Sequence, residues 1–216
     1  MSRPTGFALL IGAVVLAVTA CAPAPTLRVA MFFDNSQSTR SIHRYLADAA
    51  RLIYLNLDGE DTVQVFRLGQ NLYPLTDAVH PEPDAFDRLL ASLGRTLPQE
   101  RGTSLGGALE RGLQFVEERP GAPRAAATVL LVVFTDAADE GGTGTLNMPQ
   151  PDLQRWAQRT ARTGTFVLFV GPEGPRRERI DSALRPALGE RLSLCGRDEA
   201  PACYLNALER FRAGLS

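Results

Sequence analysis

The chain has 216 residues with 23 basic and 24 acidic side chains, so its formal net charge is −1. This length predicts one ordinary globular domain, and 44% hydrophobic residues with mixed charges exclude a disordered chain. The near-neutral balance argues against nucleic-acid binding, which needs a dense basic face.

The first twenty residues are predicted to be a secretory signal peptide. Arg3 is the only charged side chain before the apolar run Phe7–Ala20, whose 14 residues are too few to span a hydrocarbon core of about 30 Å comfortably. A basic start, a short apolar stretch and small residues at its end are typical of such a leader. The alternatives to a lipoprotein signal are an ordinary signal peptide and a membrane helix in which Cys21 stands by chance.

Residues 18–21, with the sequence VTAC, resemble a bacterial lipobox. The resemblance implies cleavage before Cys21 and acylation of Cys21, and three acyl chains exceed the two signals that stable membrane anchoring needs. Cys21 is followed by Ala22 rather than by Asp. In Gram-negative lipoproteins this favours the outer membrane. Residues 21–26 then form a short, proline-containing tether, and residues 27–216 form the single predicted domain.

Strands and helices alternate along this domain. Short apolar or β-branched runs predict strands, and apolar residues at helical spacing predict helices. The predicted strands are Leu27–Phe33, Thr62–Leu68, Asn71–Leu75, Ala127–Thr135, Thr165–Val170 and Arg191–Leu194. The predicted helices are Ser41–Leu57, Pro83–Leu93, Ser104–Glu118, Asp152–Arg162, Arg176–Leu188 and Tyr204–Leu215.

This alternation predicts an α/β fold: a doubly wound, mostly parallel open sheet with helices on both faces. Pro74 places the run around it at an edge of the sheet, because proline cannot donate to a central ladder. Ligands of such sheets bind beyond the carboxyl ends of the strands, where the strand order reverses. The residues that directly follow each strand are therefore the candidates for function.

Polar residues follow the first and fourth predicted strands and precede the third helix. The first segment is Asp34-Asn35-Ser36-Gln37-Ser38, the second contains Thr103, and the third is Thr135-Asp136. Together they offer carboxylate and hydroxyl oxygens, which Mg²⁺, Mn²⁺ and Ca²⁺ prefer as ligands. The segments contain no His or Cys, which disfavours zinc.

Taken in order, these three segments resemble the von Willebrand factor A (VWA) domain over nearly the whole predicted domain. The resemblance implies a Rossmann-like fold and a metal-ion-dependent adhesion site. It further implies direct metal ligation by Ser36, Ser38 and Thr103, with Asp34 and Asp136 binding directly or through water. One coordination position would stay open for an Asp or Glu carboxylate of a partner protein, with Mg²⁺ favoured and Mn²⁺ or Ca²⁺ as alternatives.

Two residues depart from the family pattern. Gln37 stands where a small Gly is frequent, and Ala137 stands where Gly commonly follows the aspartate. Neither change removes a ligand. Alanine resists a positive φ that glycine adopts at little cost, so we expect the loop after Asp136 to be arranged differently.

Simpler interpretations remain for the same residues. Asp34, Ser36 and Ser38 could cap the following helix, and Asp136 could be a solvated loop acid. His43 near Ser38 invites a hydrolase interpretation, although no Gly-x-Ser-x-Gly elbow accompanies it. The long Gly-rich segment 139–150 is expected to overhang the metal and help select the partner.

Cys195 and Cys203 remain once Cys21 is lipidated. Because an exported chain enters an oxidising compartment, this pair predicts a structural disulfide, with buried free thiols as the alternative.

The predicted function is a lipid-anchored, metal-dependent protein-binding module of the bacterial cell envelope, without enzymatic activity. In a Gram-negative cell it would lie on the periplasmic face of the outer membrane. The alternatives are a metal-assisted phosphate or ester hydrolase and a structural lipoprotein with a vestigial site.

Overall fold

The computed structural model describes residues 26–36, 38–68, 72–77, 80–95, 105–117, 127–137 and 148–213. The predicted signal peptide, the lipobox with Cys21, and Thr103 lie outside these residues. In the described part of the chain, no helix is both long enough and apolar enough to cross a membrane.

A six-stranded sheet in the order β3-β2-β1-β4-β5-β6 forms the centre of the molecule. All neighbouring strands are parallel except β3, which runs antiparallel to β2 at one edge. The strands are β1 Thr26–Asp34, β2 Thr62–Leu68, β3 Leu72–Pro74, β4 Ala127–Phe134, β5 Phe166–Val170 and β6 Leu192–Cys195. The doubly wound α/β prediction is confirmed, including the edge position of Pro74.

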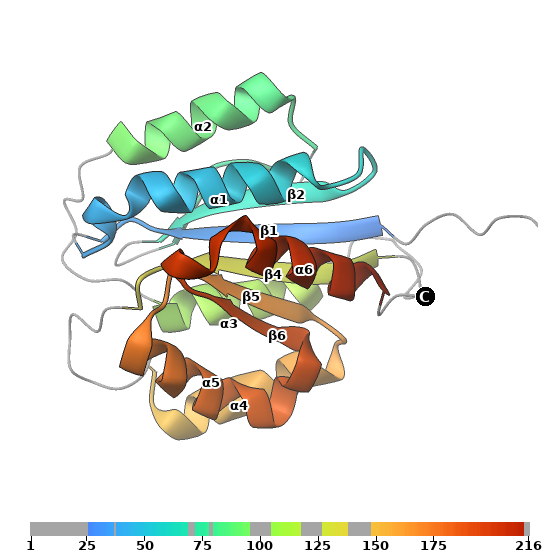
Figure 1. Cartoon of the computed structure of the whole chain (residues 1–216). Helices are drawn as coiled ribbons and strands as arrows, with labels where there is room; N and C mark the ends of the chain where they lie inside the picture. Colours follow the sequence, from blue (N-terminus) through green and yellow to red (C-terminus); the bar gives the residue numbers. More distant parts are fainter. Residues whose placement is uncertain are drawn as a thin grey trace, which may run out of the picture.

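Helices cover both faces of this sheet (Figure 1). One layer contains α1 His43–Leu55, α2 Pro83–Arg95 and α6 Ala200–Ala213. The other contains α3 Leu105–Glu117, α4 Gln150–Arg162 and α5 Gly174–Leu188. Short 3₁₀ turns lie at Ser38–Ser41, Gly189–Arg191 and Arg197–Glu199.

The central strand β1 is buried on both faces, which explains its continuous apolar sequence. Ala30 and Phe32 pack in the core beneath α3, α4 and α5, whereas Val29, Met31 and Phe33 pack beneath α1, α2 and α6. Successive side chains of a strand point to opposite faces, so one apolar run supplies both cores. Burial of this kind contributes roughly 25 cal/mol per Å² of apolar surface.

The predicted helix starts differ from the observed ones by at most four residues. The first long helix begins at His43 rather than Ser41, because the chain first makes the 3₁₀ turn Ser38–Ser41. The last helix begins at Ala200, four residues before the predicted start at Tyr204. Pro201 is compatible with that early start, since a helix's first turn needs no backbone donor there.

Candidate metal-binding site

The candidate residues come together at the carboxyl ends of β1 and β4. These strands are neighbours, with Phe33 opposite Phe134 in the register, so Asp34 lies level with Thr135. The chain leaves β1 toward β2 on one side and reaches β5 beyond β4 on the other. This is the reversal of strand order at which doubly wound sheets bind ligands.

Hydroxyl and carboxylate oxygens form a contiguous group at this point. The Oγ atoms of Ser36 and Ser38 lie 2.9 Å apart, and the Ser38 hydroxyl donates to Oδ1 of Asp136 at 3.1 Å. Asp34 and Ser36 are buried, while Ser38 and Asp136 are partly exposed. The group therefore has a buried side in the protein and an open side that a ligand can approach.

Asp34 is held in place by hydrogen bonds to both carboxylate oxygens. Its Oδ1 accepts the backbone N–H of Ser36 at 2.9 Å, and its Oδ2 accepts the Thr135 hydroxyl at 2.6 Å. The Thr135 Oγ1 in turn accepts the backbone N–H of Ala137 at 2.9 Å. Thr135 thus links the β1 and β4 loops. Sequence reasoning assigned it no role, although a hydroxyl directly after a fully covered strand was the available signal.

Thr39 is a second residue whose role the sequence did not reveal. Its buried hydroxyl lies 2.9 Å from the backbone oxygens of both Asp34 and Ser36, to which it donates. These two hydrogen bonds hold the chain after β1 close to the end of that strand. The simpler interpretation, in which Ser36 and Ser38 cap the long helix, is not supported, because α1 has Ile42 at its N-cap and no side-chain capping bond.

Ala137 adopts the positive φ that its side chain was expected to resist. Its φ is 53°, and its N–H is bonded to Thr135 as described above. The expected resistance to a positive φ is therefore contradicted at this residue, while residues 138–147 of the loop lie outside the described residues. The hydrogen bond and the burial of the residue compensate the left-handed conformation, which costs an alanine about 1–2 kcal/mol.

Substitutions at Ala137 should show how the cost of its positive φ compares with the gain from its burial. We expect Ala137→Gly to change the free energy of unfolding by less than about 1 kcal/mol, because relief of strain offsets lost burial and greater freedom of the unfolded chain. Ala137→Val should destabilise the protein by about 2 kcal/mol, since a β-branched residue is disfavoured at positive φ. Urea denaturation measures both changes, and equal stability of the Val and Gly variants would contradict the assignment.

Positively charged side chains lie beside the group. Arg176 Nη1 is 3.3 Å from Oδ2 of Asp136 and 3.3 Å from its backbone oxygen.

A cavity of about 540 Å³ adjoins Ser38 and Asp136. On its rim Arg197 pairs with Glu173, and the hydrogen bond from Arg197 lowers the pKa of Glu173. Nearby, burial raises the pKa of Tyr45 to about 12, and the Tyr45 hydroxyl donates to the Gly196 carbonyl.

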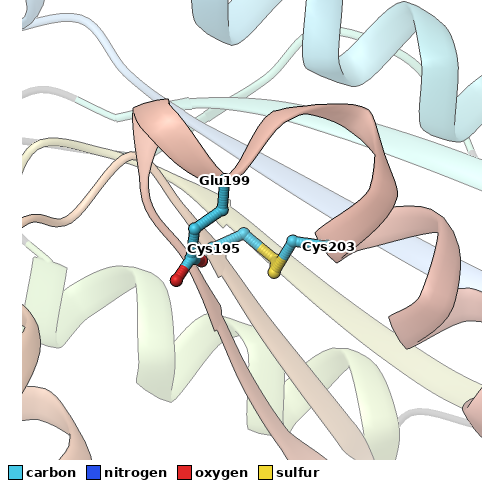
Figure 2. A group of neighbouring side chains, drawn as sticks. All are labelled: Cys195, Glu199 and Cys203. Atoms are coloured by element: carbon cyan, nitrogen blue, oxygen red, sulfur yellow. A yellow bond between two sulfur atoms is a disulfide. The ribbon is translucent and has the colours of Figure 1, made fainter.

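Cys195, Glu199 and Cys203 form a separate group that has the composition of a metal site (Figure 2). However, the two cysteines are joined in a disulfide, as predicted, so neither sulfur is a thiolate able to ligate a metal. Glu199 accepts the backbone N–H of Gly196 and pairs with Arg177. The disulfide therefore links α6 covalently to the end of β6.

Solved structures of the same fold were found by comparison. They include a manganese-loaded TRAP protein from Plasmodium vivax, with 14% identity and a TM-score of 0.63 over 88% of this chain and 74% of that chain. The chain has the von Willebrand factor A fold. The VWA domain of the pili tip protein Mfa5 from Porphyromonas gingivalis aligns over 90% of this chain and 98% of its own, with 11% identity and a TM-score of 0.61.

A von Willebrand factor type A protein from Catenulispora acidiphila also shares the VWA fold, with 16% identity, 89% coverage of this chain and a TM-score of 0.58. The alignment spans only 42% of that protein. No family model and no curated protein sequence matches the chain.

The VWA fold brings four of the five predicted site residues into one region: Asp34, Ser36, Ser38 and Asp136. Thr103, the fifth, and most of the Gly-rich segment 139–150 lie outside the described residues. The oxygens that are described form the hard donor set suited to Mg²⁺, Mn²⁺ or Ca²⁺. The residues present thus fit a divalent cation of this class.

Proposed function

We propose that the protein is a lipid-anchored module of the bacterial cell envelope that binds a partner protein through a divalent cation. Asp34, Ser36, Ser38, Thr103 and Asp136 would hold the cation, with Mg²⁺ favoured. The partner would supply an Asp or Glu carboxylate to the open position. The role is binding rather than catalysis.

The observation that carries this proposal is the contiguous oxygen group at the strand-order reversal. Ser38 lies within hydrogen-bonding distance of both Ser36 and Asp136, and Ser38 and Asp136 are partly exposed. Hydroxyl ligands position a cation without cancelling its charge. A cation held mainly by hydroxyls and few carboxylates therefore attracts an outside anionic oxygen.

The similar solved structures also support a metal-dependent role at the cell envelope. One is described as manganese-loaded, and another is a domain of a pili tip protein. Both associate this fold with metal or with cell-surface assemblies in other organisms. The predicted lipobox at Cys21 supports attachment of this chain to a membrane, with the outer membrane favoured in a Gram-negative cell.

Metal titration tests the site directly. Calorimetry with Mg²⁺, Mn²⁺ and Ca²⁺ should give saturable 1:1 binding that is lost in Asp34→Ala and Ser36→Ala. Asp84→Asn, which removes an exposed acid in the first turn of α2, is the charge-matched control and should bind normally. Wild-type protein that binds none of the three cations, alone or with partner present, would refute the metal-binding role.

Partner capture should depend on the same site. A protein retained from envelope extracts should be released by chelator and should not bind Asp136→Asn. Retention that is insensitive to both changes would overturn the metal-dependent mode. A panel of chromogenic phosphates and esters, with Asp34→Ala as control, tests the hydrolase alternative in the same preparations.

Lipid anchoring predicts a membrane-bound mature protein. The wild-type chain should partition with membranes and should carry acyl chains on Cys21 by mass spectrometry. Cys21→Ser should prevent acylation and cleavage at residue 21, which leaves a larger, unmodified product. An unacylated wild-type protein cleaved elsewhere would contradict the proposal.

A further inference from the structure

The cavity beside the metal-binding residues has a net positive lining. Its lining contains Ser38 and Asp136 of the proposed site, and it extends along the first turns of α5. Three arginines line it, Arg176, Arg179 and Arg197, against the two carboxylates of Asp136 and Glu173. The lining therefore carries one more positive than negative charge before any cation binds.

The three arginines differ in how they are held. Arg197 pairs with Glu173, and Arg176 contacts Asp136 at 3.3 Å. Arg179 is exposed and makes no ion pair with the part of the chain that the structure describes. It lies three residues after Arg176 on α5, so the two side chains share one helix face. The guanidinium of Arg179 is thus available at the cavity, next to that of Arg176, whose contact with Asp136 is long.

Cation binding would change the position of Arg176. If Asp136 held a divalent cation, its carboxylate would no longer need Arg176 for neutralisation. Arg176 would then be free to contact a ligand beside Arg179. Two neighbouring guanidinium groups suit a carboxylate ligand, because each presents a planar set of donors that matches two carboxylate oxygens.

We infer that this cavity is a second carboxylate subsite, and that the partner is recognised through a segment with at least two acidic side chains. This rests on the proposed function: the first acidic side chain reaches the cation, and the second enters the cavity and binds Arg179 and the released Arg176. Cation and acidic segment then favour each other's binding. A partner with a single acidic residue would lose the second contact.

The test uses the purified full chain and two capped tetrapeptides, one of four aspartates and one with a single aspartate among glycines. Calorimetry is run with saturating Mg²⁺ and with chelator. We expect the tetra-aspartate peptide to bind more tightly in Mg²⁺. Arg179→Gln should weaken that binding roughly tenfold, the loss typical of a charge-assisted hydrogen bond. The single-aspartate peptide should be affected less than about twofold by this exposed, screened charge.

Arg88→Gln is the matched control, because it removes one exposed arginine from α2 outside the cavity. Equal weakening by Arg179→Gln and Arg88→Gln would reduce the effect to net charge and overturn the subsite. Absence of tetra-aspartate binding would overturn it as well. Metal-dependent binding of both peptides with equal affinity would overturn the subsite but leave the proposed function intact. Arg179-dependent binding that chelator does not change would support a carboxylate contact at Arg179, but it would refute both its coupling to the cation and the metal-dependent function.

Discussion

Replacing Gly171 with alanine should destabilise the protein by about 3–5 kcal/mol and disturb the metal-binding residues. Gly171 directly follows β5 and has a φ of 111°. A Cβ at this position would lie 2.5 Å from the backbone oxygen of Thr135 and 3.1 Å from a methyl group of Leu46. Strained backbone costs about 1–3 kcal/mol and overpacking costs a similar amount.

The Thr135 oxygen cannot yield without moving the residue that holds Asp34. We therefore expect Gly171→Ala to weaken cation binding in addition to lowering the free energy of unfolding in urea. Gly164→Ala is the matched control: Gly164 has a φ of 72°, but a Cβ there would meet nothing within 4 Å. It should cost only about 1–2 kcal/mol. Equal losses in the two variants would show that backbone conformation alone, and not the contact with Thr135, sets the cost.

Asp61→Ala should lower the free energy of unfolding by about 2–4 kcal/mol. The carboxylate of Asp61 is buried and accepts three hydrogen bonds, from the backbone N–H of Leu27 at 2.7 Å, the backbone N–H of Asp58 at 2.8 Å and the Arg212 guanidinium at 3.0 Å. It connects the start of β1 to the end of α6. Removing it leaves a buried backbone donor and a partly buried guanidinium without this partner.

Asp58→Ala is the control for the same cluster. Asp58 also contacts Arg212, at 3.2 Å, but its side chain is 65% exposed. An exposed ion pair is worth little, so this variant should lose less than about 0.5 kcal/mol. Asp61→Asn should fall between the two alanine variants, because it keeps an oxygen for the Leu27 N–H and loses the charge. Urea denaturation measures all three, and equal effects of Asp61→Ala and Asp58→Ala would contradict this account.

Several features of the site were accessible from the sequence because they depend on short segments. Asp34 follows a continuous apolar strand, and Asp136 follows another, so the rule for parallel sheets was enough to predict that both lie at one edge. The spacing of Ser36 and Ser38 then predicted that their hydroxyls would join the group. Their hydrogen-bonded arrangement agrees with that prediction.

Other features depend on contacts between distant segments, which no local pattern reveals. The bond between Thr135 and Asp34 joins residues 101 positions apart, and the contact between Arg176 and Asp136 joins residues 40 positions apart. A helix starting at Arg176 was predicted, but its sequence did not indicate that this arginine would contact Asp136. Ala137 adopts the positive φ that its side chain was expected to resist, because burial and the hydrogen bond from its N–H to Thr135 outweigh a local preference of about 1–2 kcal/mol.

The sequence by itself therefore determined the fold class, the order of the main elements, the disulfide pair and the strand ends at which the candidate residues lie. Periodicity and apolar runs carry that information, since each element must bury a face against the sheet. Only the tertiary structure decided which side chains hold Asp34, that Arg176 faces Asp136, and that a cavity with three arginines adjoins the site. These are outcomes of packing between elements, in which the free energy of many distant contacts overrides the preference of any single residue.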